Sequence, residues 1–382
     1  MDSLRKLASQ HAYLNYFINR TYSITIIKEI EEINKEMVDK DFIKDVTYLK
    51  KFVEDVNLGH KNHKTKDINF QNSHLYGIWH SMFKDITSKL IETPAIEHGL
   101  FFFNNVYSDS LYTARASCLT FSDFRRDIIQ NLQKILVFTV GPYIHYAENF
   151  YTIDRIEKEK IKNGKTLLVF PTHSTHISKS HVNTKLYCES INKIAKNYNT
   201  IFICTYWWNI NDVLIKRFET EGYNIVSAGY SLDVSFLSRL KTIFSLSDFV
   251  VGDSIGTHIG YSIHLKKPFS YLDINSKVYP LKEGEIKFIE FRRNIEEDIK
   301  NIFKDSKNIT PEQEDICNKY WGLDQVKTKE ELLAISLITQ EIVCTSKGLT
   351  FNYLTTAYHL LKKYETEDAL KYSLLKDALR GI

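Results

Sequence analysis

Hydrophobic and polar positions follow two different spacings in the middle of the chain. Short apolar runs rich in β-branched residues predict strands buried on both faces, and stretches with apolar residues every three or four positions predict helices. The predicted strands cover residues 166–171, 200–207, 223–229, 248–253 and 268–273. The predicted helices between them cover residues 180–197, 211–220, 233–246 and 257–265. This alternation predicts an α/β fold with a doubly wound parallel sheet and right-handed crossovers.

The patterns before and after this region are different. Helical spacing dominates from residue 2 to about residue 57, and the polar, irregular residues 59–74 predict an exposed loop. We next expect three short strands, at residues 96–103, 116–121 and 135–140, and one helix at residues 124–133. From about residue 285 onward the apolar spacing is again helical. The first half is therefore also expected to be α/β, and helices are expected at both ends.

A length of 382 residues exceeds the usual size of a single hydrophobic core, so two domains are expected. Gly141 and Pro142 interrupt the pattern after the third short strand, and Asn163 and Gly164 break it again before the regular alternation. We place the domain boundary between these breaks. The expected units are an N-terminal domain with a helical start at residues 1–150, a second α/β domain at residues 151–285 and a helical extension at residues 286–382.

Charge and cysteine content exclude several classes of protein. The 50 Lys and Arg nearly balance the 47 Asp and Glu, which argues against nucleic acid as the main partner. A mildly basic surface still suits anionic ligands or a peripheral contact with an anionic membrane face. The five cysteines are scattered and lack CxxC spacing, so they support neither a disulfide framework nor a zinc site. No apolar run reaches membrane-spanning length, and we expect a cytoplasmic protein.

The first loop expected to carry chemistry is PTHSTHISK, residues 171–179, directly after a predicted strand. Ligands of open parallel sheets collect outside the carboxyl ends of the strands. The side chains that would contact a phosphate or a sugar are those of His173, Ser174, Thr175 and Lys179. The alternative is a polar connection with capping serines. No Asp, Glu or Cys lies nearby to complete a metal site with the histidines, so no metal is expected.

The second loop lies in FVVGDSIGTHIG, where an apolar strand gives way to small residues and a short helix. The helix would aim free backbone amides at the loop, which suits a phosphate. The candidate donor-binding residues are Asp253, Ser254, Gly256, Thr257 and His258. The alternative role for the threonine is a helix cap. The glycine spacing fits neither GxGxxG nor GxxxxGK, which disfavours nicotinamide and ATP.

The third candidate site is IEHGL, residues 96–100, where Glu97 and His98 follow a short apolar stretch and precede a turn at Gly99. Either side chain could act as general base toward a hydroxyl nucleophile. Alternatively, Glu97 is a charged loop residue, and His98 is a core histidine whose hydrogen bonds are made within the protein. LTFSDFR and VGPYIHYA also follow predicted strands, and their residues expected in the same cleft are Ser122, Arg125, Tyr143 and His145.

With these motifs in place, the chain resembles the GT-B superfamily of nucleotide-sugar glycosyltransferases, particularly bacterial enzymes that make capsule and lipopolysaccharide. The resemblance covers about residues 90–275, and the segment LSDFVVGDSIGTHIGYSIHLKKPFSYL resembles the donor-phosphate element of that superfamily. IEHGL is similar in placement to the acidic-acidic-glycine motif of GT-B sialyltransferases, with His98 at the second acid. FPTHS takes the place of their His-Pro motif, with Ser174 at the proline. A CMP-linked donor is suggested.

The resemblance implies two Rossmann-like domains facing a cleft, with the acceptor mainly on residues 1–150 and the donor mainly on residues 151–285. It also implies an enzyme without bound metal or cofactor. An acceptor hydroxyl would attack the anomeric carbon, with Glu97 or His98 as base, while the nucleotide leaves toward residues 254–258. The expected function is transfer of a sugar from a nucleotide donor to a glycan or lipid-linked glycan. Inversion and retention both stay open.

Three other functions are compatible with the same residues. A sugar-nucleotide epimerase of the UDP-GlcNAc 2-epimerase type would convert its substrate with no acceptor present. A non-catalytic assembly protein of a polysaccharide machine would need none of the candidate catalytic groups. A polyol-phosphate transferase would leave phosphate in its product. The C-terminal residues 353–379 are expected to cross back to the first domain or to dock on a membrane or a partner subunit.

Overall fold

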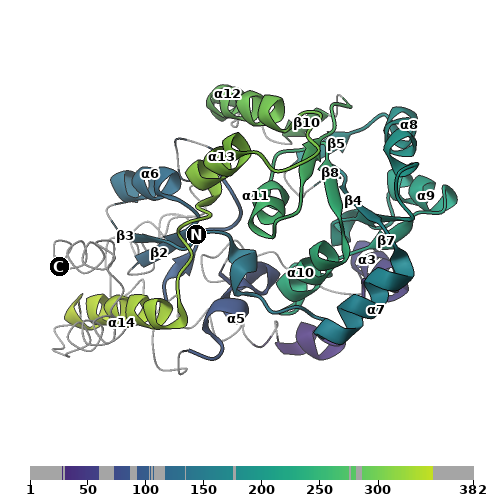
Figure 1. Ribbon diagram of the computed structural model, residues 1–382. Coiled ribbons are helices and arrows are strands. Elements are labelled where there is room, and N and C mark those ends of the chain that lie inside the picture. The colour runs from purple at the N-terminus through teal and green to yellow at the C-terminus, as the bar shows by residue number, and fades with distance from the viewer. Residues whose placement is uncertain are drawn as a thin grey trace.

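The computed structural model describes residues 28, 31–59, 73–86, 93–102, 104, 106, 117–133, 135–174, 178–274, 277–280 and 286–346. The described part of the chain is α/β and contains two parallel sheets. Helices α10 (Phe236–Leu246) and α11 (Thr257–His264) lie between the two sheets (Figure 1). None of the described helices is long and apolar enough to cross a bilayer.

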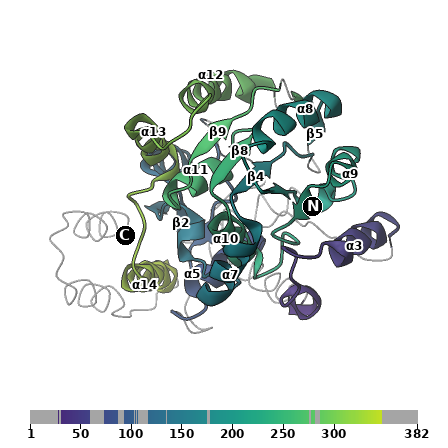
Figure 2. The same cartoon turned by 45° about the vertical axis from the view of Figure 1, so that its right-hand side comes forward.

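The larger sheet has five parallel strands in the order β7-β6-β4-β8-β9. Their bounds are β4 Thr166–Phe170, β6 Thr200–Cys204, β7 Asn224–Val226, β8 Phe249–Gly252 and β9 Phe269–Tyr271. All five predicted strands of this region and their parallel arrangement are confirmed. The strand order reverses on either side of β4, so the loops after β4 and β8 meet at a switch point of the sheet (Figure 2).

Alternate side chains of this sheet belong to two different cores, as a sheet buried on both faces requires. Leu168 and Val250 pack in the cluster that contains residues of α10 and α11. Leu167 and Val251 pack in a second cluster. The second cluster is shared with three helices, α8 Thr184–Ala195, α9 Val213–Thr220 and α3 Thr47–Asn57. The continuous apolar runs of the strands are therefore explained by helices on both faces.

The smaller sheet has three short parallel strands in the order β1-β2-β3. Their bounds are β1 Ala95–Ile96, β2 Ser117–Thr120 and β3 Leu136–Thr139, and α6 Asp123–Gln133 joins the last two. The strand expected over residues 96–103 is only two residues long, because the chain turns away at Gly99, where φ is +72°. The neighbouring elements are η1 Leu75–Gly77, α5 Ile78–Phe83, η4 Tyr143–Tyr146 and α7 Ile153–Asn163.

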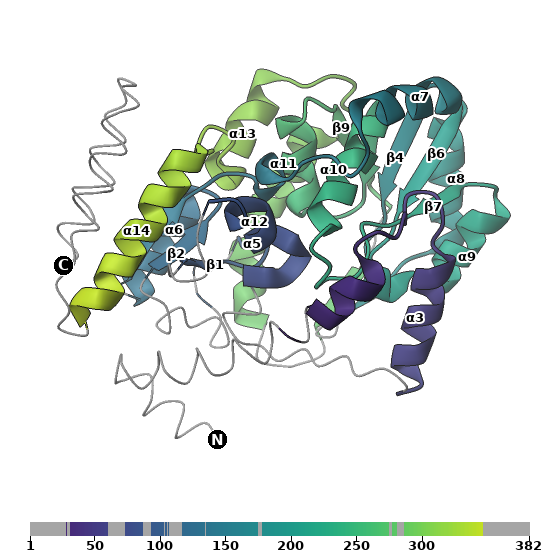
Figure 3. The ribbon, with the colours of Figure 1, turned by 90° about the horizontal axis from the view of Figure 1, so that it is seen from below.

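The early helix α3 packs on the five-stranded sheet and not on the three-stranded sheet that follows it in the chain (Figure 3). The ring of Phe52 lies 6.2 Å from that of Trp207 in the short helix η5 (Trp207–Asn209), and 5.2 Å from that of Tyr230. Asn211 donates a hydrogen bond to the carbonyl oxygen of Lys50 at 3.1 Å. The helical start of the chain thus contacts the second half.

The three C-terminal helices are α12 Ile286–Phe303, α13 Pro311–Trp321 and α14 Lys329–Ser346. Helix α12 packs against β9 of the five-stranded sheet, where the ring of Phe303 lies 5.6 Å from that of Phe269, whereas α13 and α14 return to the three-stranded sheet. Ser122 donates a hydrogen bond to the carbonyl oxygen of Tyr320 at 3.0 Å, and the hydroxyls of Ser117 and Thr339 lie 2.6 Å apart. Figure 3 shows α14 beside β2 and α6. Residues 353–379, expected to cross back in this way, lie outside the described residues.

Helix α13 also fixes α11. A Cβ atom on Gly260 would lie 2.1 Å from Cδ1 of Trp321, so the two helices approach closely only because residue 260 has no side chain. Trp321 itself is fully buried. A capping box between Thr310 and Gln313, with Pro311 at the first helical position, starts α13. Helix α13 therefore holds α11, whose first turn lies at the switch point, in place.

One pairing was not expected from the sequence. Strands β5 (Ser178–His181) and β10 (Lys277–Pro280) form a two-stranded antiparallel sheet. The helix expected from residue 180 therefore begins later, at Thr184, where the Asn183 side chain caps it by accepting a hydrogen bond from the backbone amide of Leu186 at 3.1 Å. The partner strand lies about 100 residues downstream, so no local pattern announces the pairing.

Candidate functional site

A pocket of about 290 Å³ lies where loops from the carboxyl ends of both parallel sheets meet. It receives the segments after β1 and β3 of the smaller sheet and after β4, β6 and β8 of the larger one. The predicted site residues that line it are His98, Tyr143, His173, Ser254, Gly256, Thr257 and His258. Candidates from four separate sequence motifs are therefore brought together in one cavity.

The loops after β4 and β8 are joined by Asp253. One carboxylate oxygen of Asp253 accepts a hydrogen bond from the backbone amide of Thr172 at 2.7 Å and another from the hydroxyl of Tyr187 at 3.0 Å. Asp253 is buried, and it is absent from the described pocket lining. In this geometry the carboxylate acts on the shape of the pocket by holding the two loops together.

His258 lies across the loop that precedes its helix. Its ring stacks on Phe170 at 5.0 Å between centroids. A Cβ atom on Gly252 would lie 3.0 Å from Nε2 of His258, and one on Gly256 would lie 3.1 Å from Nδ1. The glycines therefore make room for the imidazole. Among the described residues, Nε2 is buried with no hydrogen-bond partner, which leaves it available to a ligand.

Two of the pocket histidines have strongly lowered pKa values. Burial, together with the neighbouring His173, lowers the pKa of His258 to about 3, although a hydrogen bond with the Ser254 backbone opposes the shift. The ring of His173 is open to the pocket and lies 4.9 Å from that of Tyr206, and desolvation by the surrounding protein lowers its pKa to about 4. Both imidazoles are neutral at pH 7.

The first turn of α11 opens into the pocket. Gly256 occupies the N-cap position, and no side chain caps the helix there. The first turn also carries no acidic residue. Unsatisfied N–H groups and the positive end of the helix dipole favour an anionic group at such a position. Thr257 and Ser254 add hydroxyls at the same end. This end of the pocket suits a phosphate.

An aromatic wall completes the pocket and was not singled out from the sequence. It is formed by Tyr76, Phe170, Tyr206, Phe236 and Tyr261. Aromatic residues after strands or in helices more often fill cores, so their types alone carried no functional signal. Rings of this kind stack on the apolar faces of sugars or bases, while the phenol hydroxyls offer hydrogen bonds.

Glu97 is held by a buried ion pair. Its carboxylate accepts hydrogen bonds from Nε of Arg125 and from the hydroxyl of Thr120, both at 2.6 Å. Glu97 and Arg125 are 0% and 2% exposed, respectively, and neither is part of the described pocket lining. Burial raises the pKa of the Glu97 carboxyl, while the guanidinium opposes that shift. Ser122, bonded to Tyr320, also lies outside the lining.

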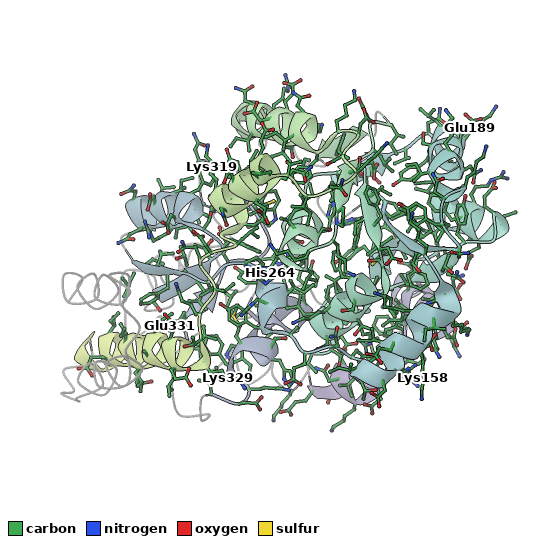
Figure 4. All side chains as sticks on the ribbon, viewed as in Figure 1. Lys158, Glu189, His264, Lys319, Lys329 and Glu331 are labelled. Atoms are coloured by element: carbon green, nitrogen blue, oxygen red, sulfur yellow. The ribbon has the colours of Figure 1, made fainter. Side chains whose placement is uncertain are left out.

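His145 borders a different cavity. This second cavity, of about 750 Å³, is lined by His145 and Tyr146 of η4, whereas Tyr143 of the same short helix lines the pocket. Nδ1 of His145 lies 3.1 Å from Nε2 of His264, at the end of α11. Burial lowers the pKa of both rings, that of His264 to about 4. In the view of Figure 4, His264 lies near the centre, whereas Lys158 and Glu189 lie at the outer edge.

Two predicted donor-binding groups cannot be placed. Thr175 and the side chain of Lys179 lie outside the described residues. Ser174 lies at the start of that segment, and its hydroxyl is 3.0 Å from the hydroxyl of Ser180. In the part of the chain that the structure describes, no three His, Cys, Asp or Glu side chains gather closely enough to hold a metal ion.

No protein family matches the sequence, and neither does any curated protein.

The lowered pKa of His258 predicts that acid destabilises the protein. The unfolded chain binds a proton at this histidine below pH 6.5, whereas the folded protein does so only near pH 3, so stability rises with pH between these values. The neutral ring contributes its full stabilisation above pH 6.5 and loses about 1.4 kcal/mol per pH unit below it. Urea unfolding at pH 7.0, 6.0 and 5.0 measures the slope. In His258→Gln the slope should fall by about 1.4 kcal/mol per pH unit, the contribution of one proton. An unchanged slope would contradict a lowered pKa of His258.

Proposed function

We propose that this protein is a glycosyltransferase that moves a sugar from a nucleotide donor to a hydroxyl of a glycan or lipid-linked glycan. The observation that carries the proposal is the pocket itself. It lies at the carboxyl ends of strands from two parallel sheets and includes the switch point between β4 and β8. Ligands of open α/β sheets bind at such points. The sequence resemblance to GT-B enzymes supports the same assignment.

The two walls of the pocket take different roles in this proposal. The first turn of α11, with Ser254 and Thr257, receives the phosphate of the donor. No Lys or Arg is present in the described lining, so the backbone amides are the electropositive groups that the structure describes there. As the sugar leaves its nucleotide, these amides stabilise the charge that develops on the phosphate oxygen.

His98 faces the same pocket from the smaller sheet. It follows β1, opposite the loops after β4 and β8. Because Glu97 is already occupied by Arg125 and Thr120, we assign the base to His98 alone. In the reaction, the acceptor hydroxyl gives its proton to the imidazole, its oxygen forms the bond to the anomeric carbon, and the sugar-phosphate bond breaks.

The volume of the pocket sets which part of the donor it encloses. Pockets for drug-sized ligands have volumes of about 300–1,000 Å³. At about 290 Å³, this pocket is large enough for a sugar and its adjoining phosphate. The nucleoside would extend past His173 toward the segment after β4. Tyr206, 4.9 Å from His173, offers a stacking partner for the base on that side.

Binding of nucleotides tests the proposal. Calorimetric titration with CMP, UDP, GDP and TDP should show one preferred nucleotide. In Thr257→Val the affinity should fall about tenfold, because one hydrogen bond to a charged group contributes about 1.5 kcal/mol or more. The matched control is Thr184→Val, at the start of α8 and outside the described pocket lining. A folded protein that binds none of the four nucleotides would refute the proposal.

Transfer is measured separately by mass spectrometry of products from a panel of sugar nucleotides and glycan acceptors. His98→Gln should lower the transfer rate about a hundredfold, the loss expected when a general base is removed. Conversion of the donor with no acceptor present would identify an epimerase instead. Phosphate retained in the product would identify a polyol-phosphate transferase. Unchanged cellular polysaccharide after the His98 substitution would support a non-catalytic assembly protein.

A further inference from the structure

Tyr76 has a backbone conformation that is rare for a residue with a side chain. Its φ is +59° and ψ is 18°, in the left-handed region. Gly77, the next residue, is also left-handed, with φ of +66°. A non-glycine residue there costs on the order of 1–3 kcal/mol, and such residues gather at functional sites. Glycine would relieve this cost, so the tyrosine side chain must be supported by its surroundings.

Three contacts hold Tyr76 in place. Its backbone amide donates a hydrogen bond to the carbonyl oxygen of Ser231 at 2.6 Å. Its ring lies 4.6 Å from that of Phe236 and 5.3 Å from that of His98, and the His98 ring is stacked on it at 27°. Burial and the neighbouring Tyr206 side chain raise the pKa of its phenol. The ring is thus held between its aromatic neighbours while its backbone is held by Ser231.

The partners of Tyr76 come from separate parts of the fold. Ser231 precedes α10 and Phe236 is its first residue, Tyr206 follows β6, and His98 follows β1. A Cβ atom on Gly77 would lie 2.2 Å from the carbonyl oxygen of Val234, so the two backbones are in direct contact. The phenol therefore fixes the position of the His98 ring relative to loops of the five-stranded sheet.

We propose that Tyr76 is a positioning residue for His98. The stacked phenol fixes the plane of the imidazole at the pocket wall, and the pair of hydroxyls on Tyr76 and Tyr206 presents hydrogen bonds to a polyhydroxylated ligand beside it. The inference rests on the proposed function for the role of His98 as base. The placement of the imidazole itself does not depend on that function.

NMR spectra of the full chain labelled at histidine rings test the placement directly. His98→Gln identifies the His98 signals by their loss. Tyr76→Phe should leave these signals nearly in place, because the stacked ring remains. Tyr76→Leu and Tyr76→Gly should both move them by removing the ring, whereas Tyr223→Leu, outside the described pocket lining, should not. The glycine variant is released from the left-handed strain, so it provides a folded protein if the leucine variant is unstable.

Kinetics then separate positioning from packing. In Tyr76→Gly we expect kcat to fall about tenfold to a hundredfold, the loss typical of a misplaced catalytic group, with a smaller change in KM. Tyr76→Phe should restore most of kcat. His98 signals that stay unchanged in both Tyr76→Leu and Tyr76→Gly would overturn the inference. If the protein binds no nucleotide, the proposed function fails, and the NMR result still decides whether Tyr76 places His98.

Discussion

Replacing Glu97 with alanine is expected to lower the free energy of unfolding by about 3–5 kcal/mol. The substitution removes the carboxylate from a buried ion pair, so the Arg125 guanidinium keeps its charge, at 2% exposure, without the oxygen that lies 2.6 Å from its Nε. Thr120 loses its acceptor as well. Urea unfolding at pH 7 followed by circular dichroism measures the loss, provided the transition is two-state.

Two further variants separate an ion pair from a catalytic base. Glu97→Gln keeps an acceptor for Thr120 and should lose less stability than the alanine variant. The double substitution Glu97→Leu with Arg125→Met removes both charges and should recover part of the loss, as replaced buried pairs often do. A Glu97→Ala protein as stable as the parent, with transfer reduced a hundredfold or more, would show instead that Glu97 is the base.

Replacing Arg239 with alanine should destabilise the protein by a similar amount, about 3–5 kcal/mol or more. The guanidinium is fully buried and paired with Asp233. It also donates to four backbone carbonyls, those of Met37, Val38, Lys40 and Ala228, at 2.7, 2.9, 2.8 and 3.3 Å. The variant leaves a buried carboxylate and several carbonyl groups without their donor. Urea unfolding at pH 7 measures the loss, and hydrogen exchange at residues 37–42 should rise with it.

An exposed ion pair provides the matched control. Arg217 on α9 pairs with Glu221, the residue that caps the C-terminus of that helix, and the arginine side chain is 54% exposed. Arg217→Ala should change stability by less than about 0.5 kcal/mol. Arg239→Lys keeps the positive charge but not the planar set of donors, so it should lie between the parent and the alanine variant. Equal effects at positions 217 and 239 would contradict the structural role of the buried guanidinium.

The five-stranded sheet was predictable because its strands have a strong local pattern. The centres of such runs, for example residues 167–170 and 249–251, are apolar, and the structure buries them between helices on both faces. The smaller sheet was harder to predict, because β1 has only two residues and pairs with β2 about 20 residues later. In such short strands the pairing is decided by tertiary contacts that local sequence does not encode.

The candidate site was predictable in its location more than in its details. Residues placed after strands, such as His173 and His258, do line the pocket. Adjacent residues of one motif nevertheless have different environments: His98 faces the pocket, while Glu97 is buried against Arg125. Successive side chains leave a strand in opposite directions, so the type of residue alone could not separate them.

The contribution of Tyr76 had no signal in the sequence. It lies just after the polar residues 59–74, which predicted an exposed loop, and its partner Ser231 is about 155 residues away. A left-handed tyrosine cannot be recognised from its neighbours, because the conformation is imposed by contacts that form only in the folded chain. Aromatic walls assembled in this way from distant segments require a structure to be found.

The packing of the two chain ends limits how this protein can be divided. Helix α3 packs on the sheet of the second half, and α13 and α14 contact the sheet of the first half through residues such as Tyr320 and Thr339. A fragment cut at residue 150 or 285 would lose helices that cover its own sheet and would expose apolar surface to solvent. Chimeras that exchange one of the two sheets with another protein must therefore take α3 and α12 with the five-stranded sheet, and α13 and α14 with the three-stranded sheet.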